Sequence, residues 1–129
     1  WTPDDFDMAR AALPRVQEFT LRVFDAGIPL LIGTDGNGAG PLMAMEMQLH
    51  ADAGIPPWDV LDLATRRSAR TMGLGRTGRI EPGYEADVAF IAVNPLADFG
   101  RLRDVRAVLS DGHYYEHEAL VQEARALLD

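Results

Sequence analysis

The sequence predicts an α/β fold, and two observations support this prediction. In the first part of the chain, apolar residues recur at helical three- and four-residue spacing. Within residues 30–36, a short apolar run ends in a single carboxylate followed by a glycine, which is typical of a buried parallel strand. From Gly78 onward the pattern changes to short β-rich runs separated by turn residues. The organisation of the chain therefore shifts near residues 73–78, from helices with one strand to mostly strands.

Three helices are expected before this shift. Pro14 would kink a longer helix or begin a new one, and Gly27 is suited to a left-handed cap, so the first helix is expected between them. Pro41 suits the first turn of the second helix, and the third begins after the break at Pro56 and Pro57. The expected ranges are 14–26, 41–54 and 58–72.

A strand, a hairpin and a final helix are expected after the shift. A β-rich apolar run ended by Asn94 and Pro95 is expected to be a strand buried on both faces. A later strand leads through the turn residues Asp111 and Gly112 into a return strand, which predicts a hairpin. The expected ranges are 88–93 for the first strand, 105–109 and 113–115 for the hairpin, and 116–128 for an amphipathic helix.

Composition and charge exclude several classes of function. With 20 acidic and 12 basic residues the net charge is -8, which opposes binding to nucleic acid and to anionic membranes. The chain has no cysteine, so disulfides and thiolate zinc sites are absent, and we expect a cytoplasmic protein. No apolar run approaches the length of a membrane span. Trp1 stands where a natural start would have Met, so we expect a piece of a longer protein.

Asp35 is the residue of clearest chemical interest. The strand expected over residues 29–35 ends in this single carboxylate, and a glycine-rich loop follows. An acidic group at the carboxyl end of a parallel strand is typical of the active sites of α/β barrels. Asp is also a preferred helix N-cap, and a helix is expected a few residues later. Both interpretations stay open at this point.

The loop after Asp35 also resembles part of a calcium loop. Its first, third, sixth and twelfth positions are Asp35, Asn37, Gly40 and Glu46. Ala39 supplies no side-chain oxygen at the fifth position, and an apolar strand precedes the loop where an EF-hand has a helix. The calcium interpretation is therefore weak.

The same glycines could cradle a phosphate through successive backbone N–H groups ahead of a helix. No GxGxxG or Walker pattern is completed, and Asp35 would repel an anion. This interpretation is weak as well.

Residues 113–117 spell the H-x-x-E-H string of some zinc peptidases. That chemistry needs both imidazoles one turn apart on a single helix. Here the string straddles the turn at Gly112, an expected strand and a helix start, so a surface hairpin is favoured over a zinc site. His50, alone on a helix flank, is expected to be a solvated or core-edge histidine.

Nine short patterns follow one another along the chain: AGIP (26–29), GTD (33–35), AGI (53–55), LAT (63–65) with SA (68–69), MGL (72–74), GRIEPG (78–83), ADV (86–88), NPL (94–96) and VLSDG (108–112). In this order and at this spacing they resemble the carboxyl-terminal third of the amidohydrolase superfamily. The resemblance covers nearly all of residues 16–115 and is greatest to the branch of imidazolonepropionases and Xaa-Pro dipeptidase-like enzymes.

The resemblance implies a (β/α)8 TIM barrel with a small composite β-sandwich domain built from both chain ends. Residues 1–75 would then be the end of the barrel, with its eighth strand at about 29–35. Residues 76–115 would be part of the composite β-domain, and residues 116–129 a C-terminal helix.

The resemblance also implies the chemistry. In this family the aspartate that Asp35 matches touches one or two divalent metal ions, commonly zinc, and accepts a proton from the metal-bound water that attacks an amide, lactam or related C–N carbon. Asp35 would thus be a metal ligand and a catalytic acid/base, and Asn37 would face a small-molecule substrate. The complete enzyme is expected to hydrolyse a C–N bond other than an ordinary peptide bond.

The family's other metal ligands, which lie on earlier barrel strands, are missing from this chain. Ala44 also stands where the family usually has a histidine. A catalytic zinc site needs about three protein ligands, so Asp35 alone cannot hold one. We therefore expect the rest of the site in a missing amino-terminal part of the same enzyme, and we expect the segment alone to be inactive and to expose apolar surface.

Two matters stay open at the level of sequence. A homo-oligomer is compatible with the residues present. The alternative to an enzyme is a non-catalytic binding or interaction module, in which Asp35 is a structural cap. The two interpretations differ in whether substitution of Asp35 affects a metal-dependent turnover.

Overall fold

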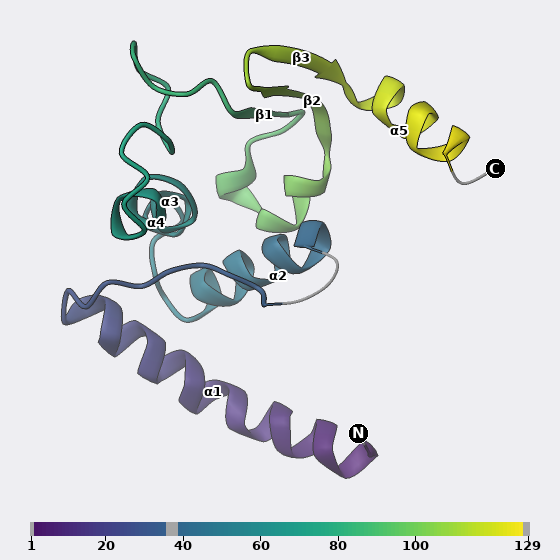
Figure 1. The fold of residues 1–129 in the computed structure, drawn as a ribbon. Coiled ribbons are helices and arrows are strands. Elements are labelled where there is room, and N and C mark those ends of the chain that lie inside the picture. The colour runs from purple at the N-terminus through teal and green to yellow at the C-terminus, as the bar shows by residue number, and fades with distance from the viewer. Residues whose placement is uncertain (1, 36–38, 128–129) are drawn as a thin grey trace.

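The computed structural model describes residues 2–35 and 39–127 (Figure 1). Helices occupy the first half of this part, and a small sheet followed by a helix occupies the second, so the α/β class is confirmed. The helices are α1 (Pro3–Asp25), α2 (Ala39–Asp52), α3 (Pro57–Asp62), the π-helical turn η1 (Leu63–Arg67), α4 (Ser68–Thr71) and α5 (His117–Ala126). The strands and 3-10 turns are β1 (Val88–Ile91), η2 (Pro95–Ala97), η3 (Phe99–Arg103), β2 (Val105–Ser110) and β3 (His113–Glu116).

Helix α1 begins earlier than the sequence predicts, at Pro3 and not near Pro14. Thr2 and Asp5 form a capping box, in which Thr2 Oγ1 accepts the Asp5 N–H at 3.3 Å and Asp5 Oδ2 accepts the Thr2 N–H at 2.6 Å. This cap satisfies N–H groups that the first helical turn leaves free, which favours a start at Pro3. Pro14 lies inside the helix, where its missing N–H removes one backbone bond without ending the helix.

Residues 29–35 do not form the predicted strand. They run unpaired between α1 and α2, and the sheet of the described residues contains β1, β2 and β3 alone (Figure 1). A parallel strand exists only through hydrogen bonds to a neighbouring strand, and no described segment supplies them here. An apolar composition alone therefore cannot make this segment a strand.

The second and third predicted helices are confirmed, with small shifts of their ends. Helix α2 spans 39–52 where 41–54 was expected, and α3, η1 and α4 together form one helical run over 57–71 where 58–72 was expected. The wider turn η1 was not predicted. Inside it, Ser68 Oγ donates to the Leu63 carbonyl at 2.5 Å, a side-chain insertion of the kind that distorts helices.

Strands β1, β2 and β3 form an antiparallel sheet in chain order. The predicted hairpin of β2 and β3 is confirmed, and its turn residues Asp111 and Gly112 have φ values of 48° and 75°. Strand β1 ends at Ile91, and the expectation that it is buried on both faces was wrong, since Phe90 is 45% exposed. Strand β1 lies at the edge of a small antiparallel sheet, and such a sheet can leave one face to solvent.

The core lies where the helices meet turn η3. Met47 of α2, Ile55, Val60 of α3 and Phe99 of η3 are each at most 2% exposed and contact one another. Gln48 Oε1 accepts the Phe99 N–H at 3.2 Å. One core therefore joins the helical part of the chain to the part that carries the sheet.

Many large apolar side chains lie outside this core, as the sequence predicts. Helix α1 has no buried residue. Exposed examples from several elements are Phe19, Leu31, Trp58, Ile80 and Leu127. Of the helices in the described ranges, none is long and apolar enough to cross a membrane.

Candidate functional site

Asp35 lies at the end of the run between α1 and α2, and the alternation along that run shows which way it faces. Half-buried and exposed residues alternate with a period of two, which is the period of an extended chain. Asp35 belongs to the exposed set, at the end of the run. The half-buried residues are Leu30, Ile32 and Thr34, and the exposed ones are Leu31, Gly33 and Asp35.

The backbone at Asp35 is left-handed, with a φ of 44°. Aspartate is one of the few non-glycine residues that adopt this conformation with some frequency. The described part of helix α2 begins at Ala39, and residues 36–38, between it and Asp35, are not described. The capping interpretation of Asp35 and the catalytic one therefore both stay predictions.

Helix α2 supports the segment that leads to Asp35. Leu30 and Ile32 pack against the core cluster that contains Met47 of α2. Glu46 of the same helix accepts the Gly33 N–H through Oε1 at 3.1 Å. This is a contact between residues thirteen apart in sequence, and it reaches the backbone two residues before Asp35.

The second predicted site residue, Asn37, lies outside the described residues, as do two neighbouring loop residues, so its expected contact with substrate stays a prediction. Glu46, which the calcium interpretation needs at its twelfth position, is bonded to Gly33. Loop residues 36–38 lie outside the described residues.

Within residues 2–35 and 39–127, no three His, Cys, Asp or Glu side chains gather closely enough to hold a metal ion. The described residues therefore do not by themselves supply the three or so protein ligands that a catalytic zinc site needs.

The three histidines do not come together in one site within the described residues. His113 begins β3 and His117 begins α5, so the H-x-x-E-H string does not lie on one helix and the surface hairpin is confirmed. His50 is half-buried, with Nδ1 2.9 Å from the Glu46 carbonyl oxygen of its own helix.

A second polar cluster lies on the helical run. Asp62 accepts hydrogen bonds from Arg66 and, at 2.8 Å, from Arg67 Nε, while Arg67 Nη2 donates to Asp59 at 2.7 Å. The hydrogen bond from Arg66 is the main reason why the pKa of Asp62 is held below its ordinary value. The Arg67 guanidinium also lies 5.7 Å from the centre of the Phe24 ring.

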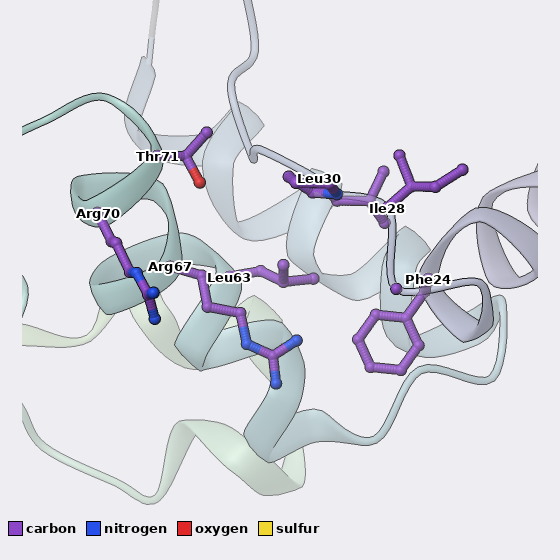
Figure 2. Close-up of a pocket in the computed structure, with 9 residues that line it drawn as sticks. Phe24, Ile28, Leu30, Leu63, Arg67, Arg70 and Thr71 are labelled. Carbon is purple, nitrogen blue, oxygen red and sulfur yellow. The ribbon is translucent and has the colours of Figure 1, made fainter.

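This cluster borders a hollow of about 340 Å³ between the end of α1 and the helical run (Figure 2). Apolar side chains from both sides face it, together with the guanidinium groups of Arg67 and Arg70. The hollow is bordered by Gly27, Ile28, Pro29 and Leu30, the start of the run that ends at Asp35, and Asp35 does not line it. The hollow therefore lies at the amino-terminal end of this run, and Asp35 at the other end.

Glu46 is the residue near the site that sequence reasoning assigned no such role. Its spacing from Gly33 is too long for any helical or turn pattern, so the bond between them is visible only in three dimensions. The sequence signals are an acidic residue on the helix expected after the candidate strand and the place of that residue at the twelfth position of the loop pattern that begins at Asp35.

Comparison with known proteins gives one family match and several partial relatives. The sequence model of the amidohydrolase family matches residues 14–115. An ochratoxinase from Aspergillus niger is 34% identical over 86 residues, which are 64% of this chain and 18% of that protein. An imidazolonepropionase from Paracoccus denitrificans (strain Pd 1222) is 38% identical over 69 residues, which are 50% of this chain and 17% of that protein.

A solved structure agrees with these matches. The crystal structure of a Xaa-Pro dipeptidase with methionine bound in its active site has a TM-score of 0.72 and 26% identity, and the match covers 80% of this chain and 26% of that one. The chain spans about a fifth of the length of the curated relatives it matches.

Proposed function

The chain belongs to the amidohydrolase family, and on that premise we propose that the complete protein is a metal-dependent hydrolase that cleaves a C–N bond, other than an ordinary peptide bond, in a small molecule. The observation that carries the proposal is the placement of Asp35. It ends the extended run between α1 and α2, and it is exposed. In a barrel, the carboxyl end of a strand is where active sites lie.

The fold of the complete protein follows from the same premise. We propose that residues 29–35 are the eighth strand of a (β/α)8 barrel and that residues 1–75 form the end of that barrel. Residues 76–115 are then part of a composite β-domain, followed by the C-terminal helix. The exposed Leu31, 47% accessible here, supports this arrangement, because a neighbouring strand and the barrel interior would cover it.

Asp35 fits a divalent metal, most simply zinc, as one ligand among several. Bound at this place, one or two such ions would supply Lewis-acid activation of the attacking water. Asp35 takes up the proton of that water on a carboxylate oxygen and delivers it to the nitrogen that leaves. Its exposed side chain is free to reach substrate, and the segment behind it is packed on α2. The remaining ligands come from the amino-terminal part of the same enzyme.

The test is Asp35→Asn in the complete protein. Asparagine keeps the size of the side chain but neither binds a cation as a carboxylate does nor carries a proton at neutral pH. We expect turnover of an amide or lactam substrate to fall by about 100-fold or more, with the far-UV circular dichroism spectrum unchanged. The control is Asp52→Asn, an exposed aspartate at the far end of α2, which should leave turnover as it is.

Two results would contradict the proposal. The first is unchanged turnover in Asp35→Asn. The second is turnover of the wild-type protein that survives complete removal of divalent metal by a chelator. Either result would favour a binding module in which Asp35 has no chemical part.

A further inference from the structure

The backbone at Gly33, two residues before Asp35, is not fixed by a side chain of its own. Leu30 and Ile32 pack against the core and Thr34 is half-buried, but Gly33 has no side chain, and a Cβ built on it would meet nothing within 4 Å. Glycine is also the residue with the widest choice of backbone angles. Side-chain packing therefore leaves the backbone free to turn at Gly33.

One hydrogen bond restrains the backbone at Gly33. Glu46 Oε1 accepts the Gly33 N–H at 3.1 Å, and no other hydrogen bond to the backbone of residues 29–35 is found within the described ranges. A bond from a charged acceptor is stronger than one between neutral groups. The donor is only two residues from Asp35, so the bond limits how far the backbone of Asp35 can turn.

The other end of this bond is rigid. Glu46 lies on α2 between Ala44 and Met47, which are 4% and 2% exposed, so the helix cannot shift here without opening the core. Met47 belongs to the same cluster that packs against Leu30 and Ile32. The hydrogen bond to Glu46 therefore ties the backbone of Gly33 to the buried core.

We propose that Glu46 is a positioning residue for Asp35: its carboxylate holds the Gly33 N–H and thereby fixes the position of the Asp35 carboxylate. This role rests on the proposed catalytic function of Asp35. Glu46 itself contacts no substrate. What it supplies is an acceptor atom at a fixed place, so the neutral carboxamide of glutamine should serve nearly as well as the carboxylate.

The test compares three variants of the complete enzyme. Glu46→Ala removes the acceptor, and Glu46→Gln keeps an acceptor oxygen while removing the charge. Gln48→Ala is a control on the same helix. It removes a side-chain acceptor whose bond goes to the Phe99 N–H and a donor whose bond goes to Asp52 at 2.8 Å, and both bonds lie away from Asp35. For each variant kcat, KM and the melting temperature are measured, with Asp35→Asn in the same assay.

If Glu46 positions Asp35, Glu46→Ala lowers kcat by about 10- to 100-fold, because a catalytic group misplaced by about 1 Å loses activity on this scale. KM changes by less than about threefold. Glu46→Gln restores kcat to within about threefold of the wild type, because the bond to Gly33 is kept. Gln48→Ala lowers the melting temperature as much as Glu46→Ala does but leaves kcat within about twofold, because its bond holds the core and not the site.

Three results would overturn the proposal. In the first, Glu46→Ala leaves kcat unchanged. In the second, Glu46→Gln is as impaired as Glu46→Ala, which would mean that the charge matters and not the bond. In the third, Gln48→Ala loses kcat to the same extent, which would mean that general destabilisation is the cause. A loss of turnover in Asp35→Asn alongside any of these would leave the proposed function standing, whereas unchanged turnover in Asp35→Asn would end both.

Discussion

At the scale of single residues, Asp62 shows how one carboxylate can organise a stretch of helix. It accepts hydrogen bonds from Arg66 and Arg67, and its side chain is 13% exposed while both arginines are about 40% exposed. Arg67 in turn reaches Asp59 and the Phe24 ring, so the network ties the helical run to the end of α1. The hydrogen bonds from arginine stabilise the charged form of Asp62, which is why its pKa is lowered.

This lowered pKa predicts a pH-dependent contribution to stability. A carboxyl whose pKa is lower in the folded state stabilises the fold at any pH above its unfolded value, 3.8, and the contribution is lost as the pH falls through the folded pKa. We expect Asp62→Asn to reduce the free energy of unfolding of the complete protein at pH 7 by about 0.5–1 kcal/mol, the upper part of the range for partly exposed ion pairs.

The measurement is denaturant unfolding of both proteins from pH 7 down to about pH 3. The difference between wild type and Asp62→Asn should shrink once the pH falls below the ordinary aspartate value. Asp7→Asn serves as the control, since Asp7 pairs with Arg10 at 3.2 Å but both side chains are at least 74% exposed, and it should have no measurable effect. A difference that stayed constant with pH would mean that the charge of Asp62 is not what stabilises the helix.

At the scale of elements, the local patterns of the sequence were sufficient for the helices and the hairpin. The periodicity of apolar residues and the turn residues Asp111 and Gly112 act over a few positions, so they could be recognised without knowledge of the fold. The start of α1 was missed because the capping box of Thr2 and Asp5 outweighed the effect of Pro14. The π-helical turn η1 was missed because it depends on side-chain bonds that no simple period encodes.

The candidate site could be predicted only in part, for a related reason. Asp35 stood out because an apolar run ended in it, but the strand itself needs neighbours that lie far away in sequence or outside this chain. The bond between Glu46 and Gly33 joins two elements, and no local rule connects residues at that spacing. What was missed at the site is therefore the part that depends on tertiary structure.

A close contact between elements explains one glycine. Gly78 has a φ of 78°, and a Cβ built on it would lie 2.9 Å from the backbone carbonyl carbon and oxygen of Thr65 in η1. The chain that leads toward the sheet thus passes directly against the π-helical turn. Any side chain here would push the two elements apart.

We expect Gly78→Ala to lower the free energy of unfolding by about 2–4 kcal/mol, which combines the cost of a left-handed alanine with the cost of overpacking. Gly83→Ala is the matched control: its φ of 88° carries the same backbone cost, but nothing lies within 4 Å of its Cβ. Denaturant unfolding of both variants separates the two terms. Equal losses in the two variants would show that the contact with Thr65 relaxes at no cost.

At the scale of the whole molecule, the described residues expose many large apolar side chains around a small core. Ile28 and Leu31, within or next to the proposed strand, are 54% and 47% exposed, and Phe6, Phe19 and Trp58 are exposed by more than half. Exposed apolar patches of this kind mark surfaces that are covered in the assembled protein or that cause aggregation. The amino-terminal part of the same enzyme is the partner that our proposal assigns to them.

We therefore expect residues 1–129, produced alone, to bind a fluorescent apolar dye much more strongly than the complete protein does, and to show no turnover. Both follow from the missing strands and the missing metal ligands. The measurements are dye fluorescence and turnover at equal molar concentration. A segment with low dye binding and a single cooperative unfolding transition would contradict the expectation, since it would show that the segment completes its own fold.

The burial of Phe99 also limits where segments of this protein can be exchanged with those of a homologue. It belongs to the sheet-bearing part of the chain, yet its ring is 1% exposed among Met47, Ile55 and Val60 of the helical part. A chimera that joins residues 1–75 of one homologue to the remainder of another would combine two halves of one core with different evolutionary histories. Recombination, in the laboratory or in nature, is better tolerated at crossover points that leave residues 39–103 to a single parent.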